Sequence, residues 1–170
     1  MILIRREKPE DIPLINSVII STFKRDAEAR LVDKLRRACA DHLSLVAEDN
    51  NTIIGHIMFT PAHIINDKTV SGMGLAPMAV IPSQQRRGIG KLLVKEGLKI
   101  LRKKKCPFVV VLGHPEYYHR FGFQRASRFN IRSQWNDVPD EPFMILVMDG
   151  ETMKNVSGIA RFRDEFNDAL

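Results

Sequence analysis

Apolar residues recur every three or four positions in three segments of the chain, which predicts helices. The first helix is expected over residues 11–24, with apolar positions at Leu14, Ile15, Val18, Ile19 and Phe23. A second helix is expected over residues 27–40 and a longer one over residues 88–104. A short helix is predicted to begin at Gly113-His-Pro-Glu and to run through Arg120.

Shorter apolar runs between these helices predict strands. They cover residues 2–6, 43–48, 52–60, 75–81, 107–112 and 143–148. Asp49-Asn50-Asn51 form a turn between two of these runs, which predicts a hairpin. Pro77 lies inside the strand expected over 75–81 and argues for a bulge or a splay there, because proline cannot donate to a strand ladder.

No segment of the sequence has the length or composition of a linker, so we expect one domain. It is placed at residues 1–150, and residues 151–170 are expected to form a polar C-terminal tail. The tail is predicted to pack on the same domain or to extend it.

Composition and charge exclude several classes of protein. The 170 residues carry 26 Lys and Arg against 20 Asp and Glu, a formal net charge of +6, and 44% are hydrophobic. No apolar run approaches the ~18 residues of a membrane span, and charges occupy the positions where a signal peptide is apolar. Two cysteines are too few for a disulfide scaffold, so a cytoplasmic protein is expected. The basic balance leaves nucleic acid, an anionic surface or a phosphorylated ligand open.

The segment with the clearest chemistry is the glycine loop, which we define as Gln85-Arg86-Arg87-Gly88-Ile89-Gly90-Lys91. It lies between a predicted strand and a predicted helix. Glycines let the backbone approach a ligand closely, and the first four N–H groups of a helix lack intrahelical partners. Together with Arg86 and Arg87 they form an anion site that suits a pyrophosphate. A plain glycine turn before a helix is the alternative.

Two common phosphate motifs do not fit this loop. A Walker loop needs Ser or Thr after its Gly-Lys pair, and this chain has Leu92 there. A dinucleotide fingerprint needs a third glycine, and this chain has Leu93 at that position.

The segment Val80-x-Pro82-x-x-Gln85-x-x-Gly88-x-Gly90-x-x-Leu93-Leu-x-x-Gly97 resembles motif A of the GNAT superfamily of N-acetyltransferases. With Tyr118-His-Arg-Phe-Gly-Phe123 and the strand patterns before it, the resemblance spans about residues 1–148. It implies an α/β domain, classed as α+β in some schemes, with a mixed, strongly twisted central sheet flanked by helices.

The resemblance also implies how acetyl-coenzyme A binds. The backbone of the strand before the loop would hold the pantetheine arm, and the loop and helix start would hold the pyrophosphate. The implied contact residues are Met78, Ala79, Val80, Gln85, Arg86, Arg87, Gly88, Ile89, Gly90 and Lys91. By the same resemblance, a backbone N–H on the Met78–Val80 strand stabilises the oxyanion.

The resemblance places a general acid at Tyr118, four residues before Gly122, where it protonates the departing thiolate. The alternatives are Tyr117 or neither tyrosine. The general base stays open: the strand before the loop has no acid, which favours a water chain or an amine delivered neutral. The remaining titratable candidates are Glu28, Glu48, His56, His63 and Glu116.

The function implied is an acetyl-coenzyme A-dependent N-acetyltransferase, in which a primary amine of an unidentified acceptor attacks the thioester directly. The alternative is an inactive GNAT-fold module that binds or senses acyl-coenzyme A. No metal is expected, because His114 and His119 lack a third ligand nearby. No nucleic-acid or membrane partner is expected, and the family resemblance also allows a homodimer.

Overall fold

Long helices form where the apolar spacing predicts them. The structure is a computed structural model that describes residues 1–168. The helices in that range are α1 (Ile12–Phe23), α2 (Ala27–Ala38), α3 (Ile89–Lys103) and α4 (Pro115–His119). The buried residues of α1 and α2 include Ile15, Ile19, Leu31 and Leu35, but Leu14, which the spacing assigned to the apolar face, is 49% exposed. No helix in the described range is long and apolar enough to cross a membrane.

The strands agree with the predicted runs in place but not in length. They are β1 (Ile2–Arg6), β2 (Leu43–Asp49), β3 (Thr52–Ile65), β4 (Thr69–Val80), β5 (Phe108–Leu112), β6 (Gln124–Arg125), β7 (Ile131–Ser133), β8 (Phe143–Val147) and β9 (Gly158–Arg161). The predicted ends at Thr60 and Leu75 were wrong, because β3 continues through Pro61 and β4 begins at Thr69. Proline and glycine are poor strand formers, so the pattern there is weak.

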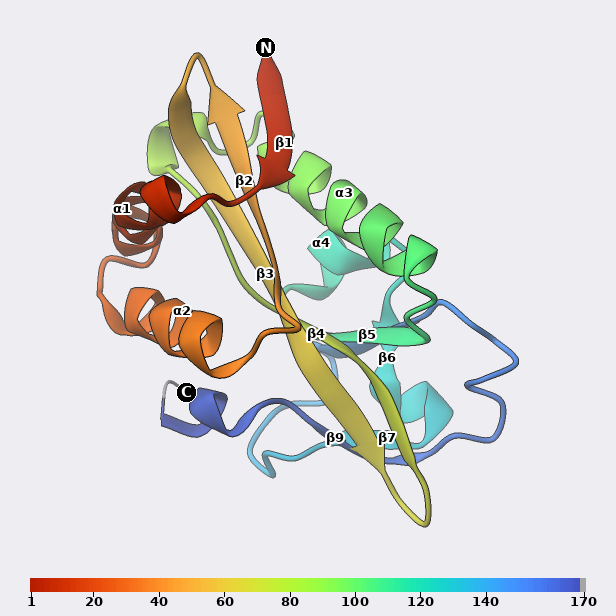
Figure 1. The fold of residues 1–170 in the computed structure, drawn as a ribbon. Helices are drawn as coiled ribbons and strands as arrows, with labels where there is room; N and C mark the ends of the chain where they lie inside the picture. The colour runs from red at the N-terminus through yellow and green to blue at the C-terminus, as the bar shows by residue number, and fades with distance from the viewer. Residues whose placement is uncertain (169–170) are drawn as a thin grey trace. The chain divides into compact units, whose positions relative to one another are not determined.

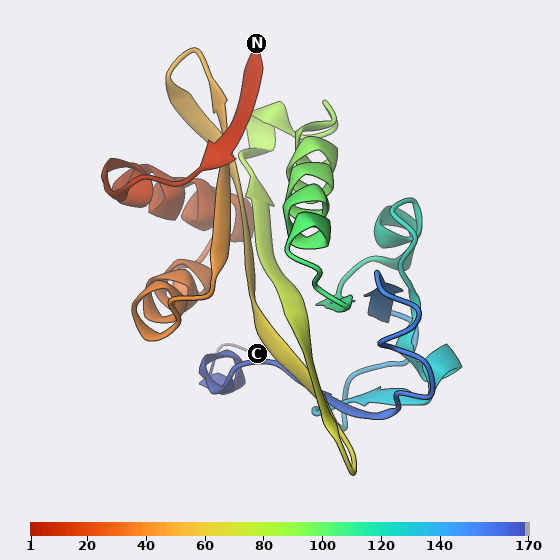
Figure 2. The same ribbon diagram turned by 45° about the vertical axis from the view of Figure 1, so that its right-hand side comes forward.

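The described residues form two compact units. The first contains residues 1–59, 76–100 and 164–168. Its strands follow the order β1-β2-β3-β4, and both β1–β2 and β2–β3 are antiparallel, with Val46 opposite His56. Helices α1 and α2 cover one side of these strands and α3 covers the other (Figure 1; Figure 2).

Close packing fixes α3 on its side of the first unit. A Cβ on Gly97 of α3 would overlap the ring of Phe59 in β3, so only glycine fits at this point of the helix. The buried side chains Leu93, Val94 and Leu98 complete the contact face of α3. The start of α3, where the glycine loop ends, is therefore held on a rigid element.

The second unit contains residues 60–75 and 101–163. In it β4 and β5 are parallel, β5 and β8 antiparallel, and β8 and β6 antiparallel. Strand β9 pairs antiparallel with β3 and parallel with β7. The mixed sheet and the α/β class are thus confirmed.

The expected polar tail contains regular structure. Residues 158–161 form β9, and Asp164–Asp168 form a short 3-10 helix. Its scattered apolar residues are core residues, since Ala160, Phe162 and Phe166 are buried. Strand β9 pairs with residues almost a hundred positions earlier, Ile65 with Ile159 for example, so no local pattern marks it. The single-domain assignment and its boundary at residue 150 stay a prediction.

Candidate functional site

The glycine loop leaves β4 and leads directly into α3. Arg86 has a φ of 63° and Gly88 a φ of 82°, a region that favours glycine. A Cβ on Gly88 would meet nothing within 4 Å, so the loop is open to an approaching group at this residue. Ile89 is buried and anchors the first turn of the helix.

The start of α3 presents free backbone donors. The ladder of helical hydrogen bonds begins at Leu92, whose N–H donates to the Gly88 carbonyl at 3.1 Å. The N–H groups of Ile89, Gly90 and Lys91 precede it and have no place in the intrahelical ladder. The positive end of the helix dipole adds to their attraction for an anion. The loop and helix start therefore have the geometry of an anion site.

The cationic side chains of the loop lie at the surface. Arg86, Arg87 and Lys91 are exposed, and within residues 1–168 none of them has an ion-pair partner. Arg87 donates to the neutral side chain of Gln84. Three positive charges without carboxylate partners lie in one short segment, and this favours a phosphate-bearing ligand.

Gln85 is exposed and also has a contact within the chain. Its Nε2 donates to the Val80 carbonyl at 2.9 Å and so ties the loop to the end of β4. The amide nitrogen carries a second N–H that a ligand can still accept from. Gln85 thus holds the loop in place and keeps one donor.

The strand segment predicted to hold the pantetheine arm lies in the first unit, with Ala79 buried and Met78 and Val80 partly exposed. The parallel ladder between β4 and β5 ends at Leu75, two residues before Pro77. The predicted splay near Pro77 is consistent with this end of the ladder.

Tyr118 belongs to the second unit and lies in an aromatic cluster. Its ring centroid is 5.0 Å from that of Tyr117 and 5.6 Å from that of Phe123. Burial raises the pKa of the Tyr118 phenol well above its usual range, with a smaller contribution from Tyr117. The phenol is therefore protonated at neutral pH, as a general acid must be.

Tyr117 keeps the alternative open. Its hydroxyl is buried and finds no hydrogen-bond partner among residues 1–168, and burial raises its pKa as well. The Arg120 guanidinium lies 4.9 Å from the centre of its ring. Both phenols thus carry a proton, and their environments alone do not choose between them.

Most candidate bases are engaged in other contacts. Glu28 accepts from Arg25, and Glu48 accepts from Arg5 at 2.8 Å. His63 Nδ1 lies 3.0 Å from the Ser71 hydroxyl. Of the described candidates, exposed Glu116 alone has no such contact. Within residues 1–168, no three His, Cys, Asp or Glu side chains gather as metal ligands would.

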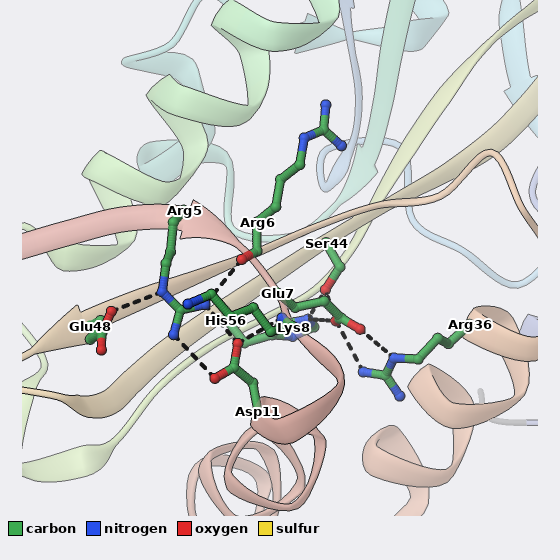
Figure 3. A network of polar contacts seen from close by, with 9 residues as sticks. All are labelled: Arg5, Arg6, Glu7, Lys8, Asp11, Arg36, Ser44, Glu48 and His56. Atoms are coloured by element: carbon green, nitrogen blue, oxygen red, sulfur yellow. Dashed lines mark hydrogen bonds and ion pairs between the residues drawn. The ribbon is translucent and has the colours of Figure 1, made fainter.

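His56 belongs to a buried polar cluster in the first unit that the sequence analysis did not identify (Figure 3). We define this buried polar cluster as Arg5, Glu7, Asp11, Arg36, Ser44, Glu48 and His56. Burial lowers the pKa of His56 to about 4, so the imidazole is neutral at pH 7. Its Nε2 lies 2.8 Å from the Ser44 hydroxyl, which also contacts Glu7.

Ion pairs complete the buried polar cluster and connect the segment that follows β1 to α2. Arg36 of α2 donates to Glu7 through Nε at 2.5 Å and Nη2 at 3.1 Å, and Arg5 pairs with Asp11 at 2.7 Å. Burial raises the pKa of Glu7, but hydrogen bonds from Arg36 and Ser44 outweigh it and lower the pKa overall. Glu7 and Arg36 are 29 positions apart in the sequence, and Arg5 and Glu48 are 43 positions apart. No local spacing marks these two pairs, and the cluster has a structural role.

Comparison with known proteins adds independent evidence. The family model described as "Acetyltransferase (GNAT) domain" matches residues 3–126. The uncharacterized N-acetyltransferase YhbS of Escherichia coli (strain K12) is 34% identical over 166 residues, which are 97% of this chain and 98% of YhbS.

Two solved structures are similar in both fold and sequence. One is YhbS from Escherichia coli in complex with CoA, with a TM-score of 0.90, 33% identity, and coverage of 98% of this chain and 92% of that chain. The other is a GNAT family acetyltransferase from Brucella melitensis in complex with acetyl-CoA, with a TM-score of 0.80, 31% identity and 98% coverage of both chains.

Proposed function

We propose, since the chain belongs to the GNAT acetyltransferase family, that it transfers the acetyl group of acetyl-coenzyme A to a primary amine by direct attack. The observation that carries the proposal is the glycine loop. Within residues 1–168, its three cations have no ion-pair partner and lie in one segment with the N–H groups at the start of α3. Space is open at Gly88, where a Cβ would meet nothing within 4 Å. Two relatives of the same fold were solved with CoA or acetyl-CoA bound, which supports the same ligand here.

Each part of the site has a proposed task. The N–H groups of Ile89, Gly90 and Lys91, with Arg86 and Arg87, bind the pyrophosphate. The backbone of Met78, Ala79 and Val80 orients the pantetheine arm and supplies the oxyanion donor, and Gln85 and Gly88 shape the loop.

When bound, acetyl-coenzyme A supplies the thioester: a C–N bond forms to the acceptor amine while the C–S bond breaks. Tyr118 holds a proton on its phenol oxygen and donates it to the departing sulfur. The neutral amine loses one proton to water or to a base, and the Tyr118 phenolate regains one proton from solvent, so the protons balance over the cycle. Replacing Tyr118 with Phe should lower turnover by roughly 10²–10⁴-fold and leave the affinity for acetyl-coenzyme A unchanged.

A second candidate function is an acyl-coenzyme A sensor without catalysis. The observation that favours it is the lack of a carboxylate between Leu75 and Val80, together with the contacts that engage Glu28, Glu48 and His56. In that case acetyl-coenzyme A binds but no acceptor is acetylated.

The test combines two measurements on the purified chain. Calorimetry with acetyl-coenzyme A is expected to show saturable binding, and lack of binding at millimolar ligand contradicts both candidates. Release of the coenzyme thiol is then followed with a panel of small amines, peptides and lysine-bearing proteins. Thiol release that depends on an amine and falls in Tyr118→Phe supports the transferase, and binding without release supports the sensor.

A further inference from the structure

Two side chains from different elements donate to one backbone oxygen at the end of β4. The Val80 carbonyl accepts from Gln85 Nε2 at 2.9 Å and from the Thr22 hydroxyl at 3.0 Å. Gln85 comes from the glycine loop, whereas Thr22 lies in the last turn of α1. A carbonyl oxygen has two lone pairs, so the Val80 oxygen can accept from both side chains.

The direction of this carbonyl follows from its own peptide unit. The N–H of Ile81 donates to the Ile54 carbonyl of β3 at 3.0 Å. In a trans peptide the C=O and the following N–H point in opposite directions, so the Val80 oxygen points away from β3. On the side away from β3, the Val80 oxygen is therefore held by the side chains of Thr22 and Gln85.

The glycine loop has few other attachments. The segment before it, Pro82–Gln84, is a single 3-10 turn. Its backbone hydrogen bonds run from the N–H of Gln84 to the Ile81 carbonyl at 2.9 Å and from the N–H of Gln85 to the Pro82 carbonyl at 3.4 Å. Residues 85–88 are all exposed. The bond from Gln85 to Val80 therefore ties this exposed segment to the sheet, and its strength depends on how well the Val80 oxygen is held.

We propose that Thr22 is a positioning residue for the glycine loop, which it influences through the Val80 carbonyl and Gln85. The inference rests on the proposed binding of acetyl-coenzyme A at this loop. By holding the Val80 peptide, Thr22 keeps Gln85 in place and preorganises the donors that face the pyrophosphate. Preorganised donors bind more tightly because less ordering is left to the binding step.

The Thr22 hydroxyl has a second acceptor, the Val18 carbonyl of its own helix at 2.8 Å. One hydroxyl proton is shared between the two carbonyls. A bond to Val18 alone would be an ordinary contact within a helix. The experiment must therefore separate the two acceptors, and the neighbouring residue Ser21 supplies the control, because its hydroxyl donates to the same Val18 carbonyl at 2.9 Å.

The variants are Thr22→Val, which removes the hydroxyl at nearly constant shape, Thr22→Ser, which keeps it, and Ser21→Ala. The dissociation constant for acetyl-coenzyme A is measured by calorimetry, and folding is checked by thermal unfolding. We expect Thr22→Val to bind about fivefold more weakly, the effect of one hydrogen bond. Thr22→Ser and Ser21→Ala should bind as the wild type does.

A double-mutant cycle tests the path through Gln85. If Thr22 acts through that side chain, Thr22→Val has little further effect on affinity once Gln85→Ala is present. A full, additive loss in the double variant overturns the proposed path.

The outcomes separate this inference from the function on which it rests. If the wild type binds acetyl-coenzyme A and Thr22→Val binds it equally well, the inference is wrong and the function stands. If Ser21→Ala weakens binding as much as Thr22→Val, the effect belongs to α1 and the inference is also wrong. If the wild type does not bind, the proposed function fails and the inference fails with it.

Discussion

In the buried polar cluster each arginine meets carboxylates, whereas in the glycine loop the arginines face solvent without them. Arg36 is only 13% exposed and contacts Glu7 and Asp33. Arg86 and Arg87 are exposed, and no ion pair within residues 1–168 includes either of them. The net charge of +6 combines both kinds of arginine. The difference lies in the carboxylate partners. An arginine that pairs with a carboxylate of the same chain stabilises the fold, whereas an arginine without such a partner is available to a ligand.

The largest expected effect tests the structural side of this comparison. Replacing Arg36 with Leu leaves Glu7 buried without its partner, which should lower the free energy of unfolding by about 3–5 kcal/mol. Urea denaturation measures the change. The matched control is Arg30→Leu, because Arg30 pairs with Asp26 at the exposed surface and should change stability by less than about 1 kcal/mol. Equal stability of the two variants would contradict the structural role of the cluster.

Acid should destabilise the same cluster through His56. The pKa of a solvated histidine is 6.5, and burial lowers the pKa of His56 to about 4 in the fold. Between these values the unfolded chain therefore binds a proton that the folded chain does not. The contribution of His56 to the free energy of unfolding is therefore fully present above pH 6.5. It falls by on the order of 3 kcal/mol as the pH drops to 4.

Denaturation curves from pH 7.5 to 4.5 check this dependence. The control variant is His63→Gln, because the His63 imidazole contacts Ser71 outside the cluster. This variant should lose the same amount of stability as the pH falls. Glu7 adds to the loss at lower pH, since its pKa is lowered in the fold. If the free energy of unfolding stays constant from pH 6.5 to 4.5, the pKa of His56 is not lowered in the fold, and the prediction is wrong.

On the ligand side, the backbone of the loop should matter more than any one of its charges. Valine at position 88 would have to adopt a φ of 82°, which costs of order 1–3 kcal/mol and should weaken acetyl-coenzyme A binding by roughly ten- to a hundredfold. Gly150→Val is the control, since a Cβ there also meets open space but no positive φ is required. Calorimetry measures the affinity of both variants for acetyl-coenzyme A. Equal affinities of Gly88→Val and Gly150→Val would mean that binding does not depend on the loop conformation.

The smallest expected effect comes from the charges themselves. Arg86→Gln and Arg87→Gln should each weaken acetyl-coenzyme A binding by about two- to fivefold, as exposed ion pairs do. The loss should shrink at high salt, where such pairs are screened. Lys95→Gln removes one charge from the exposed side of α3 and should leave the affinity unchanged. If all three variants lose the same affinity for acetyl-coenzyme A, only the overall charge of the protein matters, and the loop arginines do not contact the ligand.

The sequence predicted those features that depend on neighbouring residues. The glycine loop could be located because its glycines, cations and helix start lie within seven residues. The buried polar cluster could not, because it joins residues such as Arg5 and Glu48, or Glu7 and Arg36, that only the fold brings together. Thr22 also has no local signal, since its partner Val80 is 58 positions away.

The same limit applies to the strands. Runs with a clear apolar pattern, such as β5 and β8, were found within about one residue at each end. The short strands β6, β7 and β9 have two to four residues each and owe their order to partners elsewhere in the chain. Segments this short have no periodicity of their own to detect.

The central claim is that the glycine loop and the start of α3 bind the pyrophosphate of acetyl-coenzyme A. Its most direct test compares, by calorimetry, acetyl-coenzyme A with acetyl-pantetheine, which carries the same thioester without the pyrophosphate and the nucleotide. The account predicts that acetyl-pantetheine binds at least about a hundredfold more weakly to the wild type, and that the gap narrows in Gly88→Val. Equal affinity of the wild type for the two thioesters would contradict it.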